Sequence, residues 1–460
     1  MKKKVLTLIA MLVALTAGAA DYASYYDNLP IEVQKASPVI IQDKRVNVQE
    51  GGAVGDGYMD CTYAIQRAID QVAESGGGHV IIPAGVWITA PLRLKAGVDL
   101  HLEKNCILQL TPDRTRHIDS NTSKPVPGIY AENCLNVSIT GEGTIDGNGD
   151  MWRAMKRVNA SKQEMDRITR LGGTFSAKGD IWYPYNIRNF ENIGGNMEFV
   201  DKYRSHLIRF NKCGKILIQG VKIVNSPKFH IALADCEDVV VDGTNIQSPC
   251  NASQTIGVDV NCCQRVLLVN NVLACGDVAF DLKAGTAKTA ASHKPCEDIV
   301  IANNQVDYST GGFVIGTEFA AGVNRVVVHD NTFAKTNVGL RFKSSVGRGG
   351  KTSQIYCYNI YMTDIKEEAI LLEAEYFNFA GSEVAGTAQG KEWSPEFRDI
   401  HINNVVCSSC RKGIRAEGVA GSVRDVEIAN TSLFCQNTTS EIASECRVNL
   451  KNVKFNTFKK

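Results

Sequence analysis

The sequence has little net charge, few prolines and, after its first twenty residues, no long apolar run. Its formal net charge is +1, which argues against a dedicated nucleic-acid partner. No stretch after residue 20 is long and apolar enough to span a membrane. No pair of CxxC motifs with flanking histidines indicates zinc, and we expect neither a metal nor another cofactor. The 40 glycines, set against only 12 prolines, suit many tight turns.

The one long apolar run lies at the N-terminus and has the features of a signal peptide. A basic MKKK is followed by VLTLIAMLVALTA and by the small residues GAA. We expect residues 1–20 to be removed, the mature chain to start near Asp21, and 21–43 to form an N-terminal extension. No cysteine stands at the cleavage point, so a lipid anchor is not expected. The sequence therefore predicts an exported protein, periplasmic or secreted, without a membrane anchor and monomeric.

Fifteen cysteines in an exported chain raise the question of disulfides. For four of them we favour burial as small apolar side chains stacked at the corners of a repeat. These four are Cys213, Cys236, Cys263 and Cys296. Bridges are more plausible in the last part of the chain, between Cys407 and Cys410 and between Cys435 and Cys446.

A short apolar phrase recurs through the second half of the chain. It reads KILIQGVKI at 215–223, RVLLVNNVL at 265–273 and DIVIANNQV at 298–306, with further copies at 238–246, 325–333, 354–362, 399–407 and 425–433. The copies lie roughly 23 to 33 residues apart, and such a period is typical of a solenoid. Apolar residues alternate within each copy as in a strand, and the Asn, Asp or Gly tolerates a left-handed turn. We therefore predict an all-β fold, a single-stranded right-handed parallel β-helix over 44–460.

Three segments interrupt or close the predicted stack. Residues 62–74 have the apolar stripe of an amphipathic helix, which we expect to cap the open N-terminal end of the solenoid. Insertions are predicted at about 150–206, which is polar and aromatic, and at about 377–397, which is glycine-rich. Long loops in a compact domain are usually functional or disordered. The first insertion could close one end of a groove and favour release of terminal sugar units.

Several motifs, in this order, resemble those of the polygalacturonases. They are GAVGDGYMDCTYAIQRAID, GTIDGNGDMW, VNSPKFHIAL, GVDVNCCQRV, GDVAFDLKAG, GGFVIGTE and GLRFKSSVGRGG. The resemblance to this family, glycoside hydrolase family 28 of the pectin-lyase-like β-helix superfamily, runs from about residue 44 to about 435. It implies a right-handed parallel β-helix, no metal, and inverting hydrolysis of glycosidic bonds in an acidic polysaccharide.

The four short motifs that carry the family's chemistry are only partly kept. The pattern Asn-Thr-Asp-Gly-Ile-Asp matches 254–259, where Ile256 replaces the first aspartate and Asp259 keeps the second. Gly-Asp-Asp matches 276–278, with Asp277 kept and Val278 in the second position. Gly-His-Gly matches Ser309-Thr310-Gly311, without the histidine. Arg-Ile-Lys matches 341–343, and both cations remain. Inverting hydrolysis needs one carboxyl as acid and another as base, so a second carboxylate must be found elsewhere.

Strand alternation indicates where that carboxylate lies. Ile256, Val258 and Val260 share one parity, as do Val278, Phe280 and Leu282, and we expect both sets to face the core. Asp259, Asp277, Asp281 and Lys283 then point outward, with Asp259 and Asp281 as neighbours about 5 Å apart along the stack. We interpret Asp277 as the general acid and Asp259 or Asp281 as the base. If both of the latter are buried in ion pairs, these three residues hold no competent pair. Carbohydrate binding without turnover then becomes the better interpretation, unless another carboxylate enters the site from a loop.

Cations beside these aspartates indicate an acidic ligand. Arg341 and Lys343 share the outward parity two coils further on and suit a substrate carboxylate. Lys283 and Arg348 are further candidates for substrate binding. His230 either replaces the missing histidine or is a structural histidine.

Three functions remain open from the sequence. The favoured one is an exported glycosidase that acts on pectic or related uronic-acid polysaccharide with a rearranged acid/base site. The second is a carbohydrate-binding protein that keeps the groove but has lost turnover. The third is a β-helix lyase, which is disfavoured because no calcium-binding acidic cluster is evident. The products distinguish the three: new reducing ends, none, or an unsaturated sugar.

Overall fold

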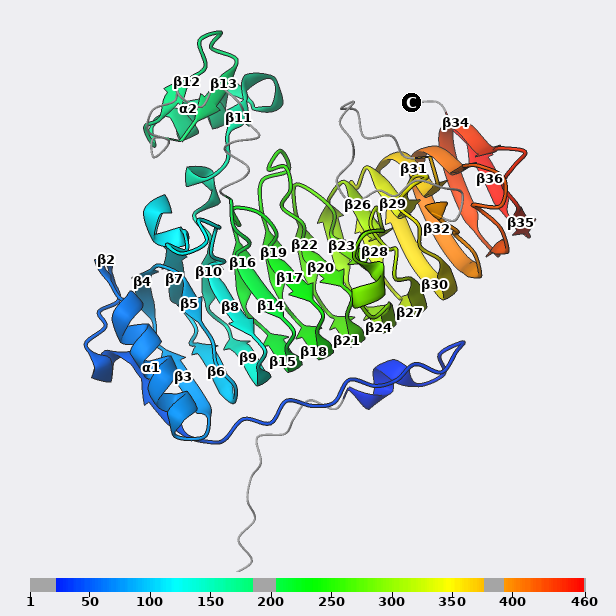
Figure 1. Cartoon of the computed structure of the whole chain (residues 1–460). Helices are drawn as coiled ribbons and strands as arrows, with labels where there is room; N and C mark the ends of the chain where they lie inside the picture. Colours follow the sequence, from blue (N-terminus) through cyan, green and yellow to red (C-terminus); the bar gives the residue numbers. More distant parts are fainter. Residues whose placement is uncertain (1–21, 185–203, 376–392, 459–460) are drawn as a thin grey trace, which may run out of the picture.

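A computed structural model describes residues 22–184, 204–375 and 393–458 and contains the predicted right-handed parallel β-helix (Figure 1). The predicted signal peptide, part of the first insertion and most of the second lie outside the described residues. Every strand pairing of the large sheet is parallel, because each coil lies on the next in the same direction. In the described part of the chain, no helix is long and apolar enough to cross a membrane.

The coils have three faces, and the strands of each face stack along the molecule. The first face contains β8 (Ile129–Glu132), β14 (Ile208–Asn211), β17 (Ile231–Ala234), β20 (Val258–Asn261), β23 (Phe280–Lys283), β26 (Gly311–Ile315), β29 (Val338–Lys343) and β31 (Ile365–Glu373). The second contains β9 (Leu135–Gly141), β15 (Gly214–Gln219), β18 (Glu237–Asp242), β21 (Gln264–Val269), β24 (Cys296–Ala302) and β27 (Val323–His329). The third contains β10 (Thr144–Asp146), β16 (Lys222–Val224), β19 (Asn245–Gln247), β22 (Val272–Ala274), β25 (Gln305–Tyr308) and β28 (Thr332–Ala334).

Shorter and longer strands complete the two ends of the stack. The first coils use β1 (Arg45–Asn47), β2 (Asp56–Asp60), β3 (Gly78–Ile82), β4 (Gly85–Thr89), β5 (Leu92–Arg93), β6 (Val98–Leu102) and β7 (Cys106–Leu110). The last coils use β30 (Thr352–Thr363), β32 (Ile400–Glu417), β33 (Val426–Ala429), β34 (Ser432–Ile442), β35 (Val448–Lys451) and β36 (Lys454–Thr457). Strand β30 pairs with both β27 and β28, so it passes from the second face to the third.

Each copy of the repeated phrase runs along the second face, turns at a corner and continues along the third face, in β30 and β32 within one long strand. The corner residue is left-handed in every copy, as the Asn, Asp and Gly predicted: Gly220, Gly243, Asn270, Asn303, Asp330, Asn359, Asn404 and Asn430. The next position holds a buried asparagine in three successive coils. Asn271 Nδ2 donates to Asn304 Oδ1 at 3.0 Å, and Asn304 Nδ2 donates to Asn331 Oδ1 at 3.0 Å. These bonds hold neighbouring coils in register inside the core.

The predicted cap is present as α1 (Thr62–Glu74), the blue helix at one end of Figure 1. Ile65, Ala68, Ile69 and Val72 are buried and belong to the main core, so the helix covers the apolar end of the first coils.

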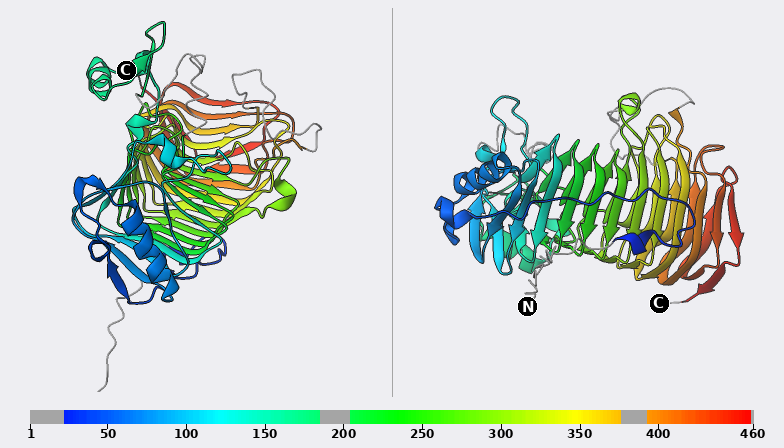
Figure 2. Two further views of the ribbon diagram at one scale, coloured as in Figure 1. Left: turned by 60° about the vertical axis from the view of Figure 1, so that its left-hand side comes forward. Right: turned by 90° about the horizontal axis from the view of Figure 1, so that it is seen from below.

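The N-terminal extension runs along the outside of the second face over several coils (Figure 2). The backbone N–H of Ser37 donates to Asp238 and that of Gln34 to Asp298, two coils further on. Val33 packs on an apolar patch of this face, which includes Leu267 and Val300. The extension therefore covers apolar surface that the stack would otherwise expose.

The first insertion folds, where described, as a small module of its own. It has α2 (Lys162–Thr169) and an antiparallel sheet of β11 (Met155–Lys156), β12 (Thr174–Phe175) and β13 (Ile181–Tyr183). Its core is a separate cluster of Met155, Met165, Ile168 and Trp182.

The cysteines are all free thiols in the structure. Cys213, Cys236, Cys263 and Cys296 are buried and stand at or just before the second-face strands β15, β18, β21 and β24, as predicted. The two predicted bridges are wrong. Cys410 is instead the register partner of Cys435, and the two sulfur atoms lie 3.7 Å apart.

Candidate active site

One row of residues on the outer side of the first face contains four charged side chains. Strand register places Arg209, Ala232, Asp259, Asp281, Val314 and Arg341 in this order on successive strands from β14 to β29. Asp259 and Asp281 are direct partners, so the prediction that they are neighbours is confirmed. Arg341 lies two coils beyond Asp281, also as predicted.

Lys283 lies between the two neighbouring aspartates. Its Nζ lies 2.5 Å from Asp259 Oδ1 and 2.9 Å from Asp281 Oδ2. The side chains of Asp259, Asp281 and Lys283 are 9%, 2% and 16% exposed. Lys283 therefore bridges the carboxylates, and both form buried ion pairs. For this arrangement the sequence predicts no competent pair among the three aspartates and favours binding without turnover, unless another carboxylate enters the site from a loop. Hydrolysis by these residues requires that Asp281 can still titrate.

The electrostatics of Asp281 favour such titration. Burial raises its pKa to about 6, and Asp259 adds to the rise, while Lys283 and Lys343 oppose it. Within the described part of the chain its Oδ1 accepts no hydrogen bond. Burial would lower the pKa of Lys283, but Asp259 and Asp281 outweigh burial and raise it. Lys283 is therefore charged, and Asp281 can change its protonation near pH 6.

The two bridged carboxylates lie too close to form an inverting pair by themselves. The two oxygen atoms bound to Lys283 cannot lie farther apart than the sum of their distances to Nζ. This sum falls below the roughly 6.5 Å that leaves room for a water molecule between acid and base. An inverting acid must therefore come from another residue.

Asp277 lies in the loop that joins β22 to β23 and is half-buried. Thr310 Oγ1 donates to Asp277 Oδ1 at 2.8 Å, and Thr310 N donates to the Asp277 carbonyl at 3.1 Å. Thr310 stands where the family motif has histidine. The retained aspartate and the substituted position are therefore in direct contact.

Ile256 and Val278 replace the two missing aspartates. The prediction that they face the main core is wrong. They pack with Val314 and Phe229 in a separate apolar cluster. Val314 is the register partner of both Asp281 and Arg341, so this cluster lies on the outer side of the first face. Val258, Val260, Phe280 and Leu282 do lie in the main core. The chain thus has an apolar patch at the positions where the family motifs have carboxylates.

Lys343 is a cation whose pKa is affected by both Asp281 and Asp277. Burial lowers its pKa, while Asp281 and Asp277 raise it and Arg341 and Lys283 lower it further. Lys343 therefore lies within electrostatic reach of both aspartates and two other cations. A substrate carboxylate placed here would add negative charge to a partly buried cationic region.

The two predicted arginine ligands are held by glutamates. Nε and Nη2 of Arg341 donate to Glu373 Oε1 at 2.8 and 2.5 Å. Arg348 pairs with Glu318, and its side chain is only 3% exposed. Arg348 is thus built into the loop rather than directed at a ligand, and its predicted role in substrate binding is not supported by this position.

His230 occupies a structural position. It is fully buried, with Nδ1 3.0 Å from the Ile256 carbonyl and Nε2 3.2 Å from that of Gln247. Burial lowers its pKa to about 4, so it is neutral. The structural interpretation of His230 is therefore the correct one.

Sequence reasoning did not single out His206, Lys228 or Arg209, which lie near Lys283. The ring centroids of His206 and Phe229 lie 4.5 Å apart, and Lys283 Nζ lies 5.1 Å from the Phe229 centroid. Burial, then Lys228, Arg209 and Lys283, hold the pKa of His206 well below its ordinary value. His206 is the last residue of the predicted insertion, outside any repeated phrase, so no pattern marked it.

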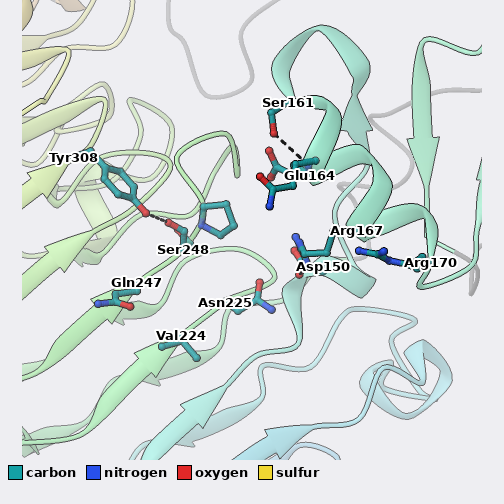
Figure 3. A pocket seen from close by; sticks show the side chains of 12 residues that line it. Asp150, Ser161, Glu164, Arg167, Arg170, Val224, Asn225, Gln247, Ser248 and Tyr308 are labelled. Carbon is teal, nitrogen blue, oxygen red and sulfur yellow. Dashed lines mark hydrogen bonds and ion pairs between the residues drawn. The ribbon is translucent and has the colours of Figure 1, made fainter.

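A separate cavity of about 630 Å³ lies between α2 and the ends of third-face strands (Figure 3). Arg167 and Arg170 line it from the insertion, and Asn225, Gln247 and Tyr308 from the coils. Tyr308 Oη donates to the Ser248 carbonyl at 2.5 Å, and Arg167 Nη1 donates to Asp150 Oδ2 at 2.7 Å. The insertion is thus placed beside the same row of loops that carries Asp277.

Comparison of the sequence with known proteins identifies its family. The sequence profile described as "Glycosyl hydrolases family 28" matches residues 158–449. The chain is 27% identical over 365 residues to an exo-poly-α-D-galacturonosidase of Dickeya chrysanthemi, which covers 74% of this chain and 58% of that protein. It is 24% identical over 380 residues to an endo-polygalacturonase of Pectobacterium carotovorum subsp. carotovorum, with 80% and 82% covered.

Solved structures agree on the fold. An exopolygalacturonase from Thermotoga maritima superposes with a TM-score of 0.74 at 24% identity, covering 92% of this chain and 94% of that one. A polygalacturonase from Erwinia carotovora ssp. carotovora gives a TM-score of 0.64 at 21% identity, covering 93% and 99%. Since the profile extends over more than half of the sequence, the chain belongs to the glycosyl hydrolases of family 28.

Proposed function

We propose that this protein is an exported, inverting glycoside hydrolase that cleaves pectic or related polysaccharide beside uronic-acid units, with a rearranged acid/base site. Membership of the family supports hydrolysis as the reaction. The names of the relatives, galacturonosidase and polygalacturonase, support an acidic galactose polymer as the substrate class. The N-terminal basic and apolar segments support export.

The observation that carries the proposal is that Asp259 and Asp281 are register partners bridged by Lys283 on the outer side of the first face, with Asp277 in the loop that leads into β23. Lys343 also lies within electrostatic reach of both Asp277 and Asp281, which supports a shared site on this face. Asp277 donates a proton to the glycosidic oxygen as the bond to the anomeric carbon breaks. Asp281, ionised above about pH 6, removes a proton from the water that attacks from the opposite side.

The remaining polar residues position these groups. Lys283 holds Asp281 and Asp259 in a fixed orientation through its two ion pairs. Lys343 attracts the carboxylate of the bound sugar. Phe229, half-buried beside Lys283, offers an aromatic surface to a sugar ring.

A second function, saccharide binding without turnover, is favoured by one observation. Both Asp259 and Asp281 are engaged by Lys283, and the apolar residues Ile256 and Val278 occupy the positions of lost carboxylates. If Lys283 keeps Asp281 from accepting a proton, the groove can bind an acidic glycan but not cleave it.

The purified mature protein should be incubated with polygalacturonate and with pectic polymers that carry other uronic-acid units, and the products analysed. New reducing ends without an unsaturated sugar are expected. An unsaturated product would assign a lyase. Binding without any product would assign the binding function.

The same experiment tests how the insertion affects the products. We propose that the module around α2 closes one end of the groove, so that terminal units are released first. Deleting residues 154–183 should lengthen the early products. Unchanged product lengths would contradict this role.

A further inference from the structure

The residue that follows a first-face strand occupies the same left-handed turn in four successive coils, but its type differs from coil to coil. The residue after β8, β14, β17 and β20 is Asn133, Lys212, Asp235 and Cys262, and all four are left-handed. In Cys262 φ is +56°, although cysteine is not among the residues that favour this conformation. The turn conformation therefore does not explain why a cysteine stands at this position.

A long loop brings a histidine to this position. The connections after β17 and β20 span only 235–236 and 262–263, whereas the connection after β23 spans 284–295. This loop contains the short 3₁₀ helix η7 (Ala290–Ser292) and returns across two coils. His293 Nδ1 then lies 2.7 Å from Asp235 Oδ1.

We infer that Asp235, Cys262 and His293 form a binding site for a divalent cation of borderline softness, with zinc as the best match. One ligand atom of each residue lies within 4.8 Å of the other two. Thiolate, imidazole and carboxylate are the three ligand types of protein zinc sites. Tetrahedral zinc, with bonds of about 2.0–2.3 Å, holds its ligand atoms roughly 3.3–3.8 Å apart. Small side-chain rotations therefore suffice.

An ordinary ion pair explains only part of this arrangement. The contact between Asp235 and His293 needs no metal, and such pairs are common at surfaces. It does not explain why a buried thiol from a third segment is directed to the same point, where its Sγ also donates to Asn261 Oδ1 at 3.2 Å. Asp235 and His293 are only partly buried, so water can complete the coordination.

The site lies beside the candidate active site but is independent of the proposed reaction. Cys262 follows Asn261, whose register partner is Lys283. Asn261 Oδ1 accepts a hydrogen bond from Gly285 N at 3.1 Å, at the start of the long loop. A bound cation would therefore fasten loop 284–295 to the coils at the ends of β17 and β20.

The direct test is a titration of the reduced, metal-free mature protein with Co²⁺ alone, followed by Zn²⁺. One equivalent of Co²⁺ should give the near-ultraviolet absorption of a thiolate–cobalt bond, and Zn²⁺ should remove it. Cys262→Ser should lose this absorption, while Cys250→Ser, which alters an exposed thiol outside the cluster, should keep it.

A second variant keeps the test decisive if Cys262→Ser does not fold. His293→Gln changes only a loop side chain and should weaken Zn²⁺ binding at least about tenfold, with His401→Gln as a matched control. Zinc should also raise the melting temperature of the wild type but not of His293→Gln. Absence of stoichiometric binding, or equal binding by His293→Gln, would overturn the site.

Discussion

Lys283 is the residue on which the chemistry of the candidate site depends most. It neutralises part of the charge of Asp259 and Asp281, which otherwise repel one another in a buried setting. Its presence lowers the pKa of Asp281 from the value that burial and Asp259 alone would produce. Asp281 then titrates near pH 6. A general base with such a pKa is ionised at neutral pH and can still accept a proton.

Asp277→Asn should reduce kcat on an acidic oligosaccharide roughly 10²- to 10⁴-fold, because the amide cannot protonate the leaving oxygen. Binding of the same oligosaccharide should be preserved, as measured by calorimetry. Asp307→Asn is the control, because Asp307 is an exposed aspartate paired with Lys335. Wild-type kcat in Asp277→Asn would remove Asp277 from the mechanism.

Lys283→Met should move the acidic limb of the kcat/KM profile to higher pH. Wild-type activity is expected to fall as the pH drops through about 6, because Asp281 becomes protonated and cannot act as base. Removal of the Lys283 charge favours the protonated form, so the pKa of Asp281 rises.

The pH profile of Lys283→Met needs two comparisons. Lys283→Arg keeps the charge and should keep the limb near the wild-type position. Lys335→Met, which removes an exposed lysine, should leave the profile unchanged. An unchanged limb in folded Lys283→Met would show that Asp281 is not the titrating base.

Lys343→Ala should weaken binding of a uronic-acid oligosaccharide roughly 10- to 100-fold, since a charged hydrogen bond contributes about 1.5–3 kcal/mol. A neutral oligosaccharide of equal length should bind as before. Lys343 is a cleaner probe than Arg341, whose removal would leave the buried Glu373 without its ion pair. Lys222→Ala, an exposed change on the third face, is the control, and equal losses for both ligands would make Lys343 structural.

At the scale of the element, regular strands could be predicted from the sequence and the segments before them could not. The repeated phrases alternate with period two, so their strands, corners and buried faces followed directly. Ile256 and Val278 lie just before β20 and β23, where the chain is not yet extended. A Cβ at Gly257 would lie 2.6 Å from the Ala279 carbonyl oxygen, so the chain packs closely here and alternation does not apply.

The row of buried asparagines, Asn271, Asn304 and Asn331, is expected to contribute to the stability of the β-helix. Asn304→Ala should lower the free energy of unfolding by about 2 kcal/mol, because it leaves the buried backbone N–H of Asn271 without its acceptor and removes one hydrogen bond each from Asn271 Nδ2 and Asn331 Oδ1. Gln305→Ala, an exposed change one residue later, should have an effect within about 0.5 kcal/mol. Equal stability of the two variants in denaturant unfolding would contradict this role of the asparagine row.

At the scale of the whole molecule, the motif order identified the family and the repeats identified the architecture. The position of the site on the outer side of the first face followed from strand parity, as Asp259 and Asp281 show. The ion pairs of Lys283, Arg341 and Arg348 could not be predicted, since their partners depend on how strands and loops far apart in sequence are placed. For the same reason the contact between His293 and Asp235 could not be predicted from the sequence.

The central claim is that Asp277, with Asp281 held by Lys283, performs inverting hydrolysis. The most direct measurement is proton NMR of the first reducing ends released from an oligogalacturonide by the wild-type protein. The account predicts that the newly formed end has the anomeric configuration opposite to that of the bond cleaved, and that Asp277→Asn releases none. Retained configuration, an unsaturated product, or binding without any product would contradict it.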